Sequence, residues 1–327
     1  MRICVTGVGG FAGSFLSEVL IQERHEVHGI LSQRNDRSNL TGIESKLHLY
    51  PVDLCIADTT REVLESIQPE GIFHLASNAI PSQSFQQPRE VLTANTLVTV
   101  NLFEALRILR LRPKILCVSS VDVYKTGGTE PLMEHSAIGP SSPYGISKYT
   151  QELLCQYYER VHDLPSVVVR PFAFTGTRQK PFFAVPSFAK QVAMIETGKQ
   201  APVIEVGNVD TVRDYCDVKD IVRGLLLAFR HGKSTEVYNL CSGRGVSLRE
   251  ILGMFSEQTR AVIKIEINQK YLRAFDAPRV IGDFSKVAKD TGWQPKIALS
   301  TTLTEMLEYW RTSTTNLNQL SRERGIA

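Results

Sequence analysis

Three glycines at a regular spacing follow the first apolar run of the chain. Residues 2–6 form that run, Gly7, Gly10 and Gly13 come next, and residues 14–21 carry apolar side chains at helical spacing. The first glycine permits a tight turn, the second lets backbone approach a pyrophosphate, and the third lets a helix pack on the preceding strand. The helix amino terminus then offers free N–H groups and the positive end of its dipole to the phosphates. This strand–turn–helix unit predicts a dinucleotide-binding fold.

Short apolar runs recur through the first half of the chain. They lack polar alternation, as expected for parallel strands that are covered on both faces. Segments with helical periodicity lie between several of them. The runs occur at residues 2–6, 26–31, 47–52, 71–76, 114–119 and 166–170, and the helical segments at 14–21, 89–109 and 144–161. We expect an α/β fold over residues 1–172, a doubly wound parallel sheet of the Rossmann type.

The second half of the chain is less regular, because several prolines interrupt the pattern and shorter elements follow. We expect residues 173–327 to form mainly a smaller mixed α/β region that binds the substrate, with some segments returning to the sheet. Residues 301–310 are predicted to form a helix, and the polar tail from Thr312 is expected to be frayed.

Two of the helical segments carry apolar stripes. The side chains predicted to face inward are Val91, Asn95, Val98, Leu102 and Leu106 on the first, and Leu153, Leu154, Tyr157 and Val161 on the second. Such a stripe packs either in the core or against a second subunit, and the sequence leaves both arrangements open.

Composition argues against several classes of partner. A net charge of +3 over 327 residues gives no reason to expect binding to nucleic acid or to a membrane. No apolar stretch approaches the roughly 20 residues of a membrane-spanning helix. The chain begins on a strand-like segment without a charged leader, so we expect a cytoplasmic protein.

The cysteines and histidines predict neither a disulfide framework nor a metal site. The six cysteines are scattered, and Cys4, Cys117, Cys155 and Cys241 lie in apolar runs that are typical of reduced core thiols. The seven histidines show no metal-ligand spacing, and His74, inside an apolar run, is predicted to be a core residue.

The segment after the second strand decides between the two nicotinamide dinucleotides. An NAD site usually carries a carboxylate there that bonds the ribose 2′-hydroxyl, but residues 31–35 contain no acid. Ser32, Arg34 and Arg37 are instead predicted to receive a 2′-phosphate, which a guanidinium matches with two hydrogen bonds. The alternative is that these arginines only decorate a loop. We expect NADP(H), with NAD(H) as the alternative, and place Asp53 and Leu54 at the adenine edge.

A tyrosine and a lysine predict the centre of proton transfer. Tyr144 and Lys148 lie one helical turn apart, so their side chains share a helix face. A free phenol has a pKa of about 10, and we expect the neighbouring ammonium and a positive nicotinamide to lower it. Ser120, after another apolar run, is predicted to hydrogen-bond the reacting oxygen. In a reduction, Tyr144 would protonate a carbonyl oxygen, and Lys148 would restore that proton through the cofactor ribose.

Two further polar residues have open roles. Asn95, on the apolar stripe of its helix, either carries a water in the proton relay or is a satisfied core amide. Asp122, two residues after Ser120, acts either as an acid or base or as a ligand for a substrate hydroxyl.

Together these motifs resemble the extended short-chain dehydrogenase/reductases that act on nucleotide sugars, over nearly the whole chain. The resemblance rests on the glycine loop and on residues 73–77, 119–124, 142–148 and 170–172. In the second half, residues 206–215, 237–243 and 291–295 look like the branch of GDP-mannose 4,6-dehydratases and GDP-4-keto-6-deoxymannose reductases, and residues 188–198 look closest to the reductases.

This resemblance implies a homodimer and a nucleotide-sugar substrate, a nucleoside diphosphate joined to a 4-keto-6-deoxyhexose. The matching positions assign Phe11, Ala12, Leu75, Ala76 and Ser77 to the cofactor site, and Ser84, Arg178, Asn208, Arg213 and Arg273 to the substrate site. The family usually has Asn-His after Arg-Pro-Phe, where this chain has Ala173 and Phe174, and Ala274 stands where a proline is usual. We expect both changes to affect the sugar-nucleotide pocket and not the hydride-transfer centre.

The motifs therefore predict an NADP(H)-dependent 4-ketoreductase of a nucleotide-linked deoxysugar. One alternative is a 4,6-dehydratase or 4-epimerase that retains its cofactor. Another is a non-catalytic dinucleotide-binding sensor, which is disfavoured because Tyr144 and Lys148 are both present. Asp122 stands where the dehydratases carry glutamate, but the reductases tolerate an acid there, so only the match in the second half favours the reductase.

Overall fold

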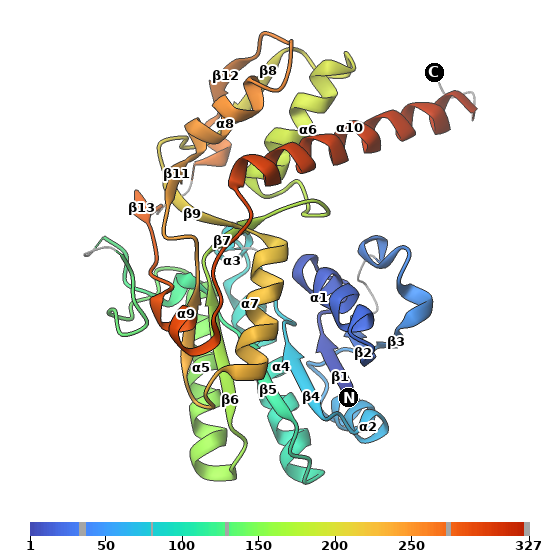
Figure 1. Cartoon of the computed structure of the whole chain (residues 1–327), viewed down its shortest axis with the longest axis vertical. Coiled ribbons are helices and arrows are strands. Elements are labelled where there is room, and N and C mark those ends of the chain that lie inside the picture. Colours follow the sequence, from blue (N-terminus) through green and yellow to red (C-terminus); the bar gives the residue numbers. More distant parts are fainter. Residues whose placement is uncertain (33–36, 80, 128–130, 273–275, 324–327) are drawn as a thin grey trace.

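The largest element of the fold is a seven-stranded parallel sheet. The computed structural model describes residues 1–32, 37–79, 81–127, 131–272 and 276–323. The strands of this sheet are β1 (Arg2–Thr6), β2 (Glu26–Leu31), β3 (His48–Pro51), β4 (Gly71–His74), β5 (Lys114–Val118), β6 (Ser166–Pro171) and β10 (Val237–Leu240). Their order is β10-β6-β5-β4-β1-β2-β3, and every pair in the sheet is parallel (Figure 1). This is the strand order of a doubly wound sheet, so the predicted fold class is confirmed.

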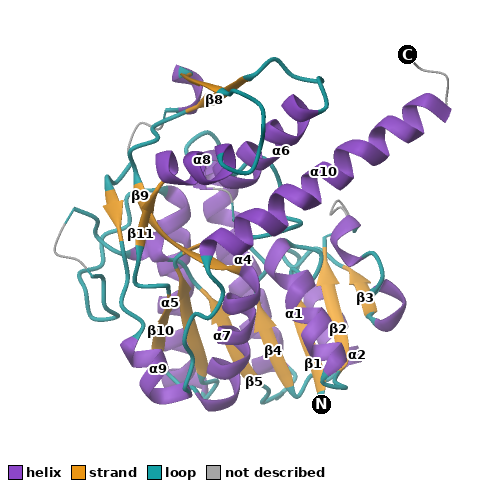
Figure 2. Cartoon of the chain, turned by 45° about the horizontal axis from the view of Figure 1, so that its top comes forward, coloured by secondary structure: helices purple, strands orange, loops and turns teal. Residues whose placement is uncertain are grey.

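Helices cover both faces of the sheet (Figure 2). One face packs against α1 (Phe11–Gln22), α7 (Val218–His231) and α9 (Ser285–Thr291). The other face packs against α2 (Ala57–Ile67), α4 (Pro88–Ile108) and α5 (Pro143–His162). The short helix α3 (Pro81–Ser84) and the 3-10 turns η1 (Ser38–Leu40), η2 (Glu44–Lys46), η3 (Val121–Val123) and η4 (Gln269–Tyr271) lie in connections.

A second group of elements stands above the carboxyl ends of the strands (Figure 1). Its helices α6 (Ala184–Glu196), α8 (Leu248–Ser256) and α10 (Leu299–Glu323) share a hydrophobic cluster with β8 (Val203–Val206), which pairs with β12 (Lys264–Ile267). A small sheet joins it to the large one. That sheet contains β7 (Ala173–Thr175), β9 (Val212–Asp217), β11 (Gly245–Ser247) and β13 (Arg279–Val280). Three elements of the second half, β10, α7 and α9, belong to the large sheet and its helical layers.

The apolar stripe predicted on α4 is confirmed, because Val91, Asn95, Val98, Leu102 and Leu106 are all buried. Contrary to the sequence-based expectation, α4 is long and apolar enough to cross a membrane, the one such helix in the part of the chain that the structure describes. Its stripe is buried against the sheet and α5. The hydropathy of α4 therefore reflects its place as a core helix of the doubly wound fold.

The inward direction predicted for the apolar stripe of α5 is wrong for three of its four residues. Leu153, Tyr157 and Val161 are 46%, 45% and 59% exposed, and only Leu154 packs partly against the core. The buried face carries Lys148, Gln151, Glu152, Cys155 and Tyr158 instead. Polar side chains occupy this face because most of their polar atoms hydrogen-bond other buried groups, which offsets much of the penalty of burying them.

Two other expectations have opposite outcomes. The chain from Thr312, expected to be frayed, is helical as far as Glu323, because α10 continues to that residue. The four cysteines in apolar runs are buried and free, as predicted, and His74 is a fully buried core residue.

Candidate active site

The glycine loop leaves a backbone cradle at the amino terminus of α1. Gly7 has a φ of +75°, and a Cβ there would lie 3.0 Å from the backbone nitrogen of Ala76. A Cβ on Gly13 would lie 2.3 Å from the Gly7 carbonyl oxygen, so only glycine lets α1 approach the turn this closely. Phe11 and Ala12 follow in the first turn of the helix. A glycine-rich turn at the positive end of a helix fits a dinucleotide pyrophosphate.

Thr6 holds the neighbouring loop against this cradle, a role that sequence reasoning missed. Its Oγ1 accepts hydrogen bonds from the backbone nitrogens of Leu75 (3.2 Å) and Ala76 (3.0 Å), and it bonds the Nδ1 of His74 at 2.9 Å. Burial, with a smaller contribution from the charge of Lys148, lowers the pKa of His74 to about 3. The imidazole is therefore neutral. Leu75 and Ala76 lie beside Gly7, and Ser77 follows them in the chain; the assignment of all three to the cofactor site remains a prediction. A buried threonine at the end of the strand was the signal that sequence reasoning could have used.

The residues predicted to read the cofactor ribose are only partly described. Arg34 lies outside the described residues, and Ser32 is the last described residue before that gap. Arg37 forms an exposed ion pair with Glu44 at 3.0 Å. An exposed pair of this kind contributes little to stability and leaves the guanidinium able to change partner.

Asp53 and Leu54 hold the turn that follows β3. The Asp53 carboxylate accepts a hydrogen bond from the Cys55 backbone at 2.9 Å, and the buried Leu54 accepts one at its carbonyl from Asn101 at 2.8 Å. These hydrogen bonds fix the turn that leads into α2. Contact of Asp53 and Leu54 with an adenine remains a prediction.

The start of α5 is built to bring Tyr144 against the turn that follows β5. Ser142 caps the helix by accepting a hydrogen bond from the Gly145 nitrogen at 3.0 Å. A Cβ on Gly145 would lie 2.4 Å from the Asp122 carbonyl oxygen, so the glycine permits the close approach. Tyr144, Ser120 and Asp122 therefore form one cluster.

Within that cluster, Ser120 and Asp122 bond each other. The Ser120 hydroxyl donates to the Asp122 carboxylate at 3.1 Å and accepts from the Asp122 backbone nitrogen at 3.1 Å. The carboxylate thus lies beside the reacting groups, and the geometry is compatible with both roles that the sequence leaves open for it.

The expectation that the ammonium lowers the pKa of Tyr144 is wrong for the protein alone. Burial raises that pKa, the Asp122 charge raises it further, and a hydrogen bond with Ser120 acts in the opposite direction. The Lys148 Nζ lies 6.0 Å from the centre of the Tyr144 ring and donates to the Val118 carbonyl oxygen at 2.7 Å. Tyr144 is therefore a protonated phenol at neutral pH, the form that can donate a proton.

Lys148 is held by Gln151, which sequence reasoning also missed. The Gln151 amide oxygen accepts a hydrogen bond from Nζ at 3.1 Å. Burial lowers the pKa of Lys148 to about 8. The sequence could have indicated this contact, because a residue three positions after a lysine in a helix lies on the same helix face.

Behind Lys148, a buried ion pair joins α5 to β6. Glu152 receives hydrogen bonds from Arg170 at 2.8 and 2.5 Å and from the Ser119 hydroxyl at 2.5 Å. A buried pair with this many hydrogen bonds fixes the helix against the sheet. Lys148 lies one helical turn before Glu152 on the same face of α5, so this ion pair also holds Lys148 in place.

The structure favours the core-amide alternative for Asn95. Its side-chain oxygen accepts from the Asn78 nitrogen at 2.7 Å, and its nitrogen donates to the Ser147 hydroxyl at 2.9 Å and the Asn78 carbonyl at 3.3 Å. Both amide hydrogens are used in these bonds. Asn95 therefore clamps α4 to α5 and to the loop after β4.

The predicted substrate residues are dispersed over several elements. Ser84 is fully buried in α3, and Asn208 is exposed in the turn between β8 and β9, where it accepts from the Asp210 nitrogen at 3.1 Å. Arg213 lies on β9 and pairs with Asp276 at 2.5 Å. Arg273 and Ala274 lie outside the described residues.

Arg178 lies beside the cofactor cradle rather than among the other predicted substrate residues. Its guanidinium stacks 3.8 Å above the Phe15 ring, pairs with Glu18 at 2.9 Å and donates to the Asn39 carbonyl at 3.2 Å. The arginine therefore braces α1 against the loop after β2, and a role in the substrate site remains a prediction.

Phe174, one of the two residues that depart from the family pattern, contacts the residue that follows the glycine turn. The Phe174 ring stacks on Phe11 with centroids 5.6 Å apart and planes 7° apart. The aromatic ring thus covers the first residue of α1. This change affects the cofactor side of the site, which the sequence-based expectation had not included.

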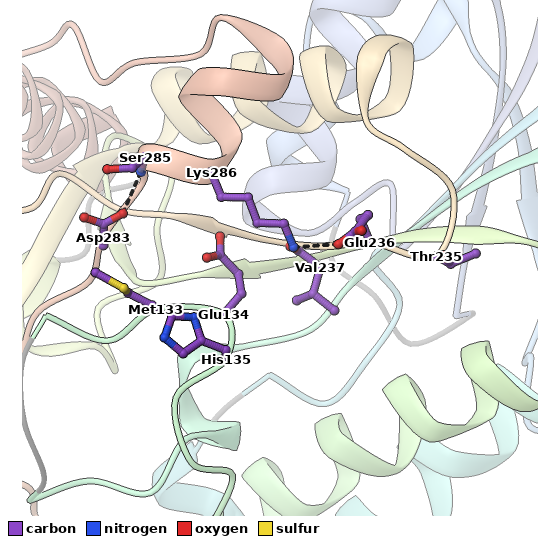
Figure 3. A pocket seen from close by; sticks show the side chains of 9 residues that line it. All are labelled: Met133, Glu134, His135, Thr235, Glu236, Val237, Asp283, Ser285 and Lys286. Atoms are coloured by element: carbon purple, nitrogen blue, oxygen red, sulfur yellow. Dashed lines mark hydrogen bonds and ion pairs between the residues drawn. The ribbon is translucent and has the colours of Figure 1, made fainter.

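A separate cavity of about 570 Å³ opens at the free edge of β10 (Figure 3). Lys286 pairs there with Glu236 at 2.7 Å, and Asp283 accepts from the Ser285 nitrogen at 2.7 Å. Its lining contains none of the predicted site residues. It is lined by Met133, Glu134, His135, Thr235, Glu236, Val237, Asp283, Ser285 and Lys286.

Comparison with known proteins agrees with this geometry. GDP-6-deoxy-D-mannose reductase from Pseudomonas aeruginosa is 30% identical over 94% of this chain and 97% of its own length. The structure of RMD from Pseudomonas aeruginosa complexed with NADPH superimposes with a TM-score of 0.80 at 30% identity, covering 95% of this chain and 99% of that one. The UDP-glucose 4-epimerase from Thermotoga maritima, solved with UDP-glucose, gives 0.87 at 27% identity, covering 96% and 100%. The family model described as GDP-mannose 4,6 dehydratase matches residues 4–306, so the chain belongs to this family of nucleotide-sugar enzymes.

Proposed function

We propose that the protein is an NADPH-dependent reductase of the C4 keto group of a nucleotide-linked 4-keto-6-deoxyhexose. The observation that carries the proposal is the buried, protonated Tyr144 between Ser120 and Lys148. A phenol whose pKa is raised by burial suits protonation of an oxygen, which is the direction that a reduction needs. The similarity to a GDP-6-deoxy-D-mannose reductase over 94% of the chain supports the same reaction class.

Each residue of the cluster has a distinct task in this proposal. The nicotinamide, when bound, supplies hydride to the carbonyl carbon. Ser120 donates a hydrogen bond to the carbonyl oxygen after releasing Asp122, and Tyr144 gives that oxygen its proton. Lys148, held by Gln151, would restore the proton to Tyr144, and the ribose hydroxyls of a bound dinucleotide would provide the path for it.

The cofactor is proposed to be NADP(H), with NAD(H) as the weaker alternative. The relatives were solved with NADPH in one case and with NAD in another. We expect Arg34→Ala to weaken NADPH binding at least tenfold and NADH binding by much less, because only NADPH carries the 2′-phosphate. Dissociation constants from nucleotide fluorescence would test this. An equal loss for both nucleotides would contradict the assignment of Arg34.

The nucleotide sugar is proposed to bind over the carboxyl ends of the strands. Residues 1–172, joined by β10 and α7, would hold the dinucleotide, and the rest of residues 173–327 would hold the sugar nucleotide. Arg213 and Asn208 on this side can contact the diphosphate. Arg213 would then exchange Asp276 for phosphate oxygens.

We further propose a cytoplasmic homodimer. The exposed apolar stripe of α5, formed by Leu153, Tyr157 and Val161, supports a subunit interface. A stripe of this kind on a long helix packs well against its own copy across a two-fold axis.

A cofactor-retaining 4-epimerase or 4,6-dehydratase is the second candidate, favoured by the TM-score of 0.87 to an epimerase and by the name of the matching family model. The two classes differ in whether NADPH is consumed. A retained nucleotide in freshly purified protein would favour this candidate, and free exchange would favour the reductase.

The deciding experiment follows absorbance at 340 nm with NADPH and GDP-4-keto-6-deoxymannose. We expect stoichiometric oxidation of NADPH by the wild type. Tyr144→Phe should lower kcat by 10²-fold or more while NADPH affinity stays within a few-fold, because only the proton donor is lost. Unchanged turnover in Tyr144→Phe would exclude it as the proton donor. Absence of oxidation by the wild type, with dehydration of GDP-mannose, would move the assignment to the dehydratase.

A further inference from the structure

Two neighbouring strands bring a glutamate and two histidines to one place. Glu26 and His28 are two residues apart on β2, so their side chains lie on the same face of the sheet. His48 begins β3 and is paired with His28 in the strand register. Sequence spacing predicts no metal site because the histidines are far apart in the chain, but the register places them opposite each other.

The ligand atoms of these three residues converge. The Glu26 Oε1 lies 3.1 Å from the His28 Nε2 and 3.8 Å from the His48 Nε2, and the ligand atoms of the three residues all lie within 4.8 Å of one another. The two imidazoles are stacked, with centroids 4.8 Å apart and planes 19° apart. Both Nε2 atoms therefore approach the same carboxylate oxygen.

Tyr50 provides the outer partner that a metal-binding histidine usually has. It lies two residues after His48 on β3, and its hydroxyl is 3.1 Å from the Nδ1 of His28. A hydrogen bond at one ring nitrogen orients the imidazole and leaves the other nitrogen to bind a metal. His28 is therefore oriented by Tyr50 with its Nε2 directed toward Glu26.

We propose that Glu26, His28 and His48 form a binding site for one divalent first-row transition-metal ion, with Zn²⁺ as the best fit. Two imidazoles and one carboxylate are ligands that Zn²⁺ prefers, and Mg²⁺ and Ca²⁺ prefer oxygen ligands alone. Zinc–ligand bonds of about 2.0–2.1 Å in a tetrahedron separate neighbouring ligand atoms by roughly 3.3 Å. The separations of 3.1 and 3.8 Å lie on either side of that value.

Burial and charge fit this assignment. The His28 side chain is 8% exposed, whereas those of His48 and Glu26 are 59% and 51% exposed, so one ligand is fixed and two can close on an ion from solvent. The Glu26 carboxylate supplies a negative charge beside the two imidazoles, which favours a divalent cation over a neutral ligand.

The site lies away from the proposed reaction centre. Glu26 and His48 are the first residues of their strands, whereas the glycine loop and Ser120 follow the carboxyl ends of β1 and β5. β3 is an edge strand of the large sheet (Figure 1). The bound ion would tie this edge strand to β2 and stabilise the sheet without taking part in hydride transfer.

Calorimetric titration of the chelator-treated full-length protein with ZnCl₂ tests the proposal. We expect one site in the wild type, at least tenfold weaker binding in His48→Ala, and about 10–100-fold weaker binding in Tyr50→Phe, which keeps every ligand but loses the outer hydrogen bond. His135→Ala, which removes an exposed histidine elsewhere, should bind like the wild type. MgCl₂ should give no binding.

Thermal unfolding provides the second readout. Zn²⁺ should raise the Tm of the wild type and of His135→Ala, because a ligand that binds the folded state stabilises it, and should not raise the Tm of His48→Ala. Absence of a Zn²⁺ site in the wild type would overturn the proposal. Equal Zn²⁺ binding by wild type and His48→Ala would also overturn it and would assign the ion to other ligands such as the partly exposed Cys55.

Discussion

At the scale of single residues, buried polar side chains set the chemistry of the proposed site. Lys148 and Glu152 are 2% and 1% exposed, and both lie on the face of α5 that meets the sheet. Charges are buried only where partners compensate them, and these residues have the Val118 carbonyl, Gln151 and Arg170. The compensation is incomplete for Lys148, because burial still lowers the pKa of its ammonium.

The lowered pKa of Lys148 predicts a pH dependence of stability. The group has a pKa of about 8 in the folded state and 10.5 as its ordinary value. Between these values the unfolded chain binds more protons, so the contribution of Lys148 to the free energy of unfolding rises with pH across this window. We expect wild type to gain on the order of 3 kcal/mol relative to Lys148→Met between the two values.

Urea unfolding of both proteins at a series of pH values from 7.5 to about 11 measures this difference. Titrating groups that do not interact with Lys148 are common to the two proteins and cancel in the comparison. A difference that stays constant across the window would show that the folded lysine has its ordinary pKa.

At the scale of elements, one position in α1 controls how closely helix and turn approach. A Cβ on Gly13 would lie 2.3 Å from the Gly7 carbonyl oxygen. Gly13→Ala must therefore displace α1 or the turn. We expect a loss of about 1–3 kcal/mol in the free energy of unfolding, as for overpacked sites, and at least tenfold weaker NADPH binding because the pyrophosphate cradle shifts.

Gly253→Ala is the matched control for this substitution. Gly253 lies inside α8, and a Cβ there would have nothing within 4 Å. Alanine should stabilise that helix by about 0.5–1 kcal/mol. Denaturant unfolding and nucleotide titration of both variants give the comparison, and a Gly13→Ala protein that behaves like Gly253→Ala would contradict the described packing.

At the scale of the whole molecule, the apolar stripe of α5 predicts self-association. We expect the wild type to be a dimer and Leu153→Arg to be a monomer, because a charge in the centre of an apolar interface is costly to bury. Val262, which lies between α8 and β12 and is 91% exposed, offers a control. Val262→Arg should remain dimeric.

Sedimentation or light scattering at several concentrations distinguishes these states. A monomeric wild type, or a Leu153→Arg dimer of unchanged affinity, would exclude α5 as the interface. The fold of the monomer should be intact in each case, since Leu153 and Val262 are both exposed.

The sequence by itself determined six of the seven strands of the large sheet and the order of its motifs. Parallel strands buried on both faces leave continuous apolar runs, so β1 to β6 were found within a few residues, and the glycine spacing marked the start of α1. Tyr144, Lys148 and Ser120 could be proposed as catalytic residues because the chemistry of such groups depends on residue type and local spacing. The motifs do not separate a reductase from a dehydratase or an epimerase, so the proposed assays decide among these activities.

Only the tertiary structure decided which side of α5 is buried and which distant residues meet. Apolar residues indicate the buried face of a helix only where the core that it meets is apolar. On α5 the buried face is polar, because Glu152 pairs with Arg170 of β6, and Leu153 and Tyr157 lie on the exposed face. The pairing of His28 with His48 could not be predicted from the sequence either, because it depends on the register between two strands. Local patterns encode elements, whereas pairs between elements depend on how the chain packs in three dimensions.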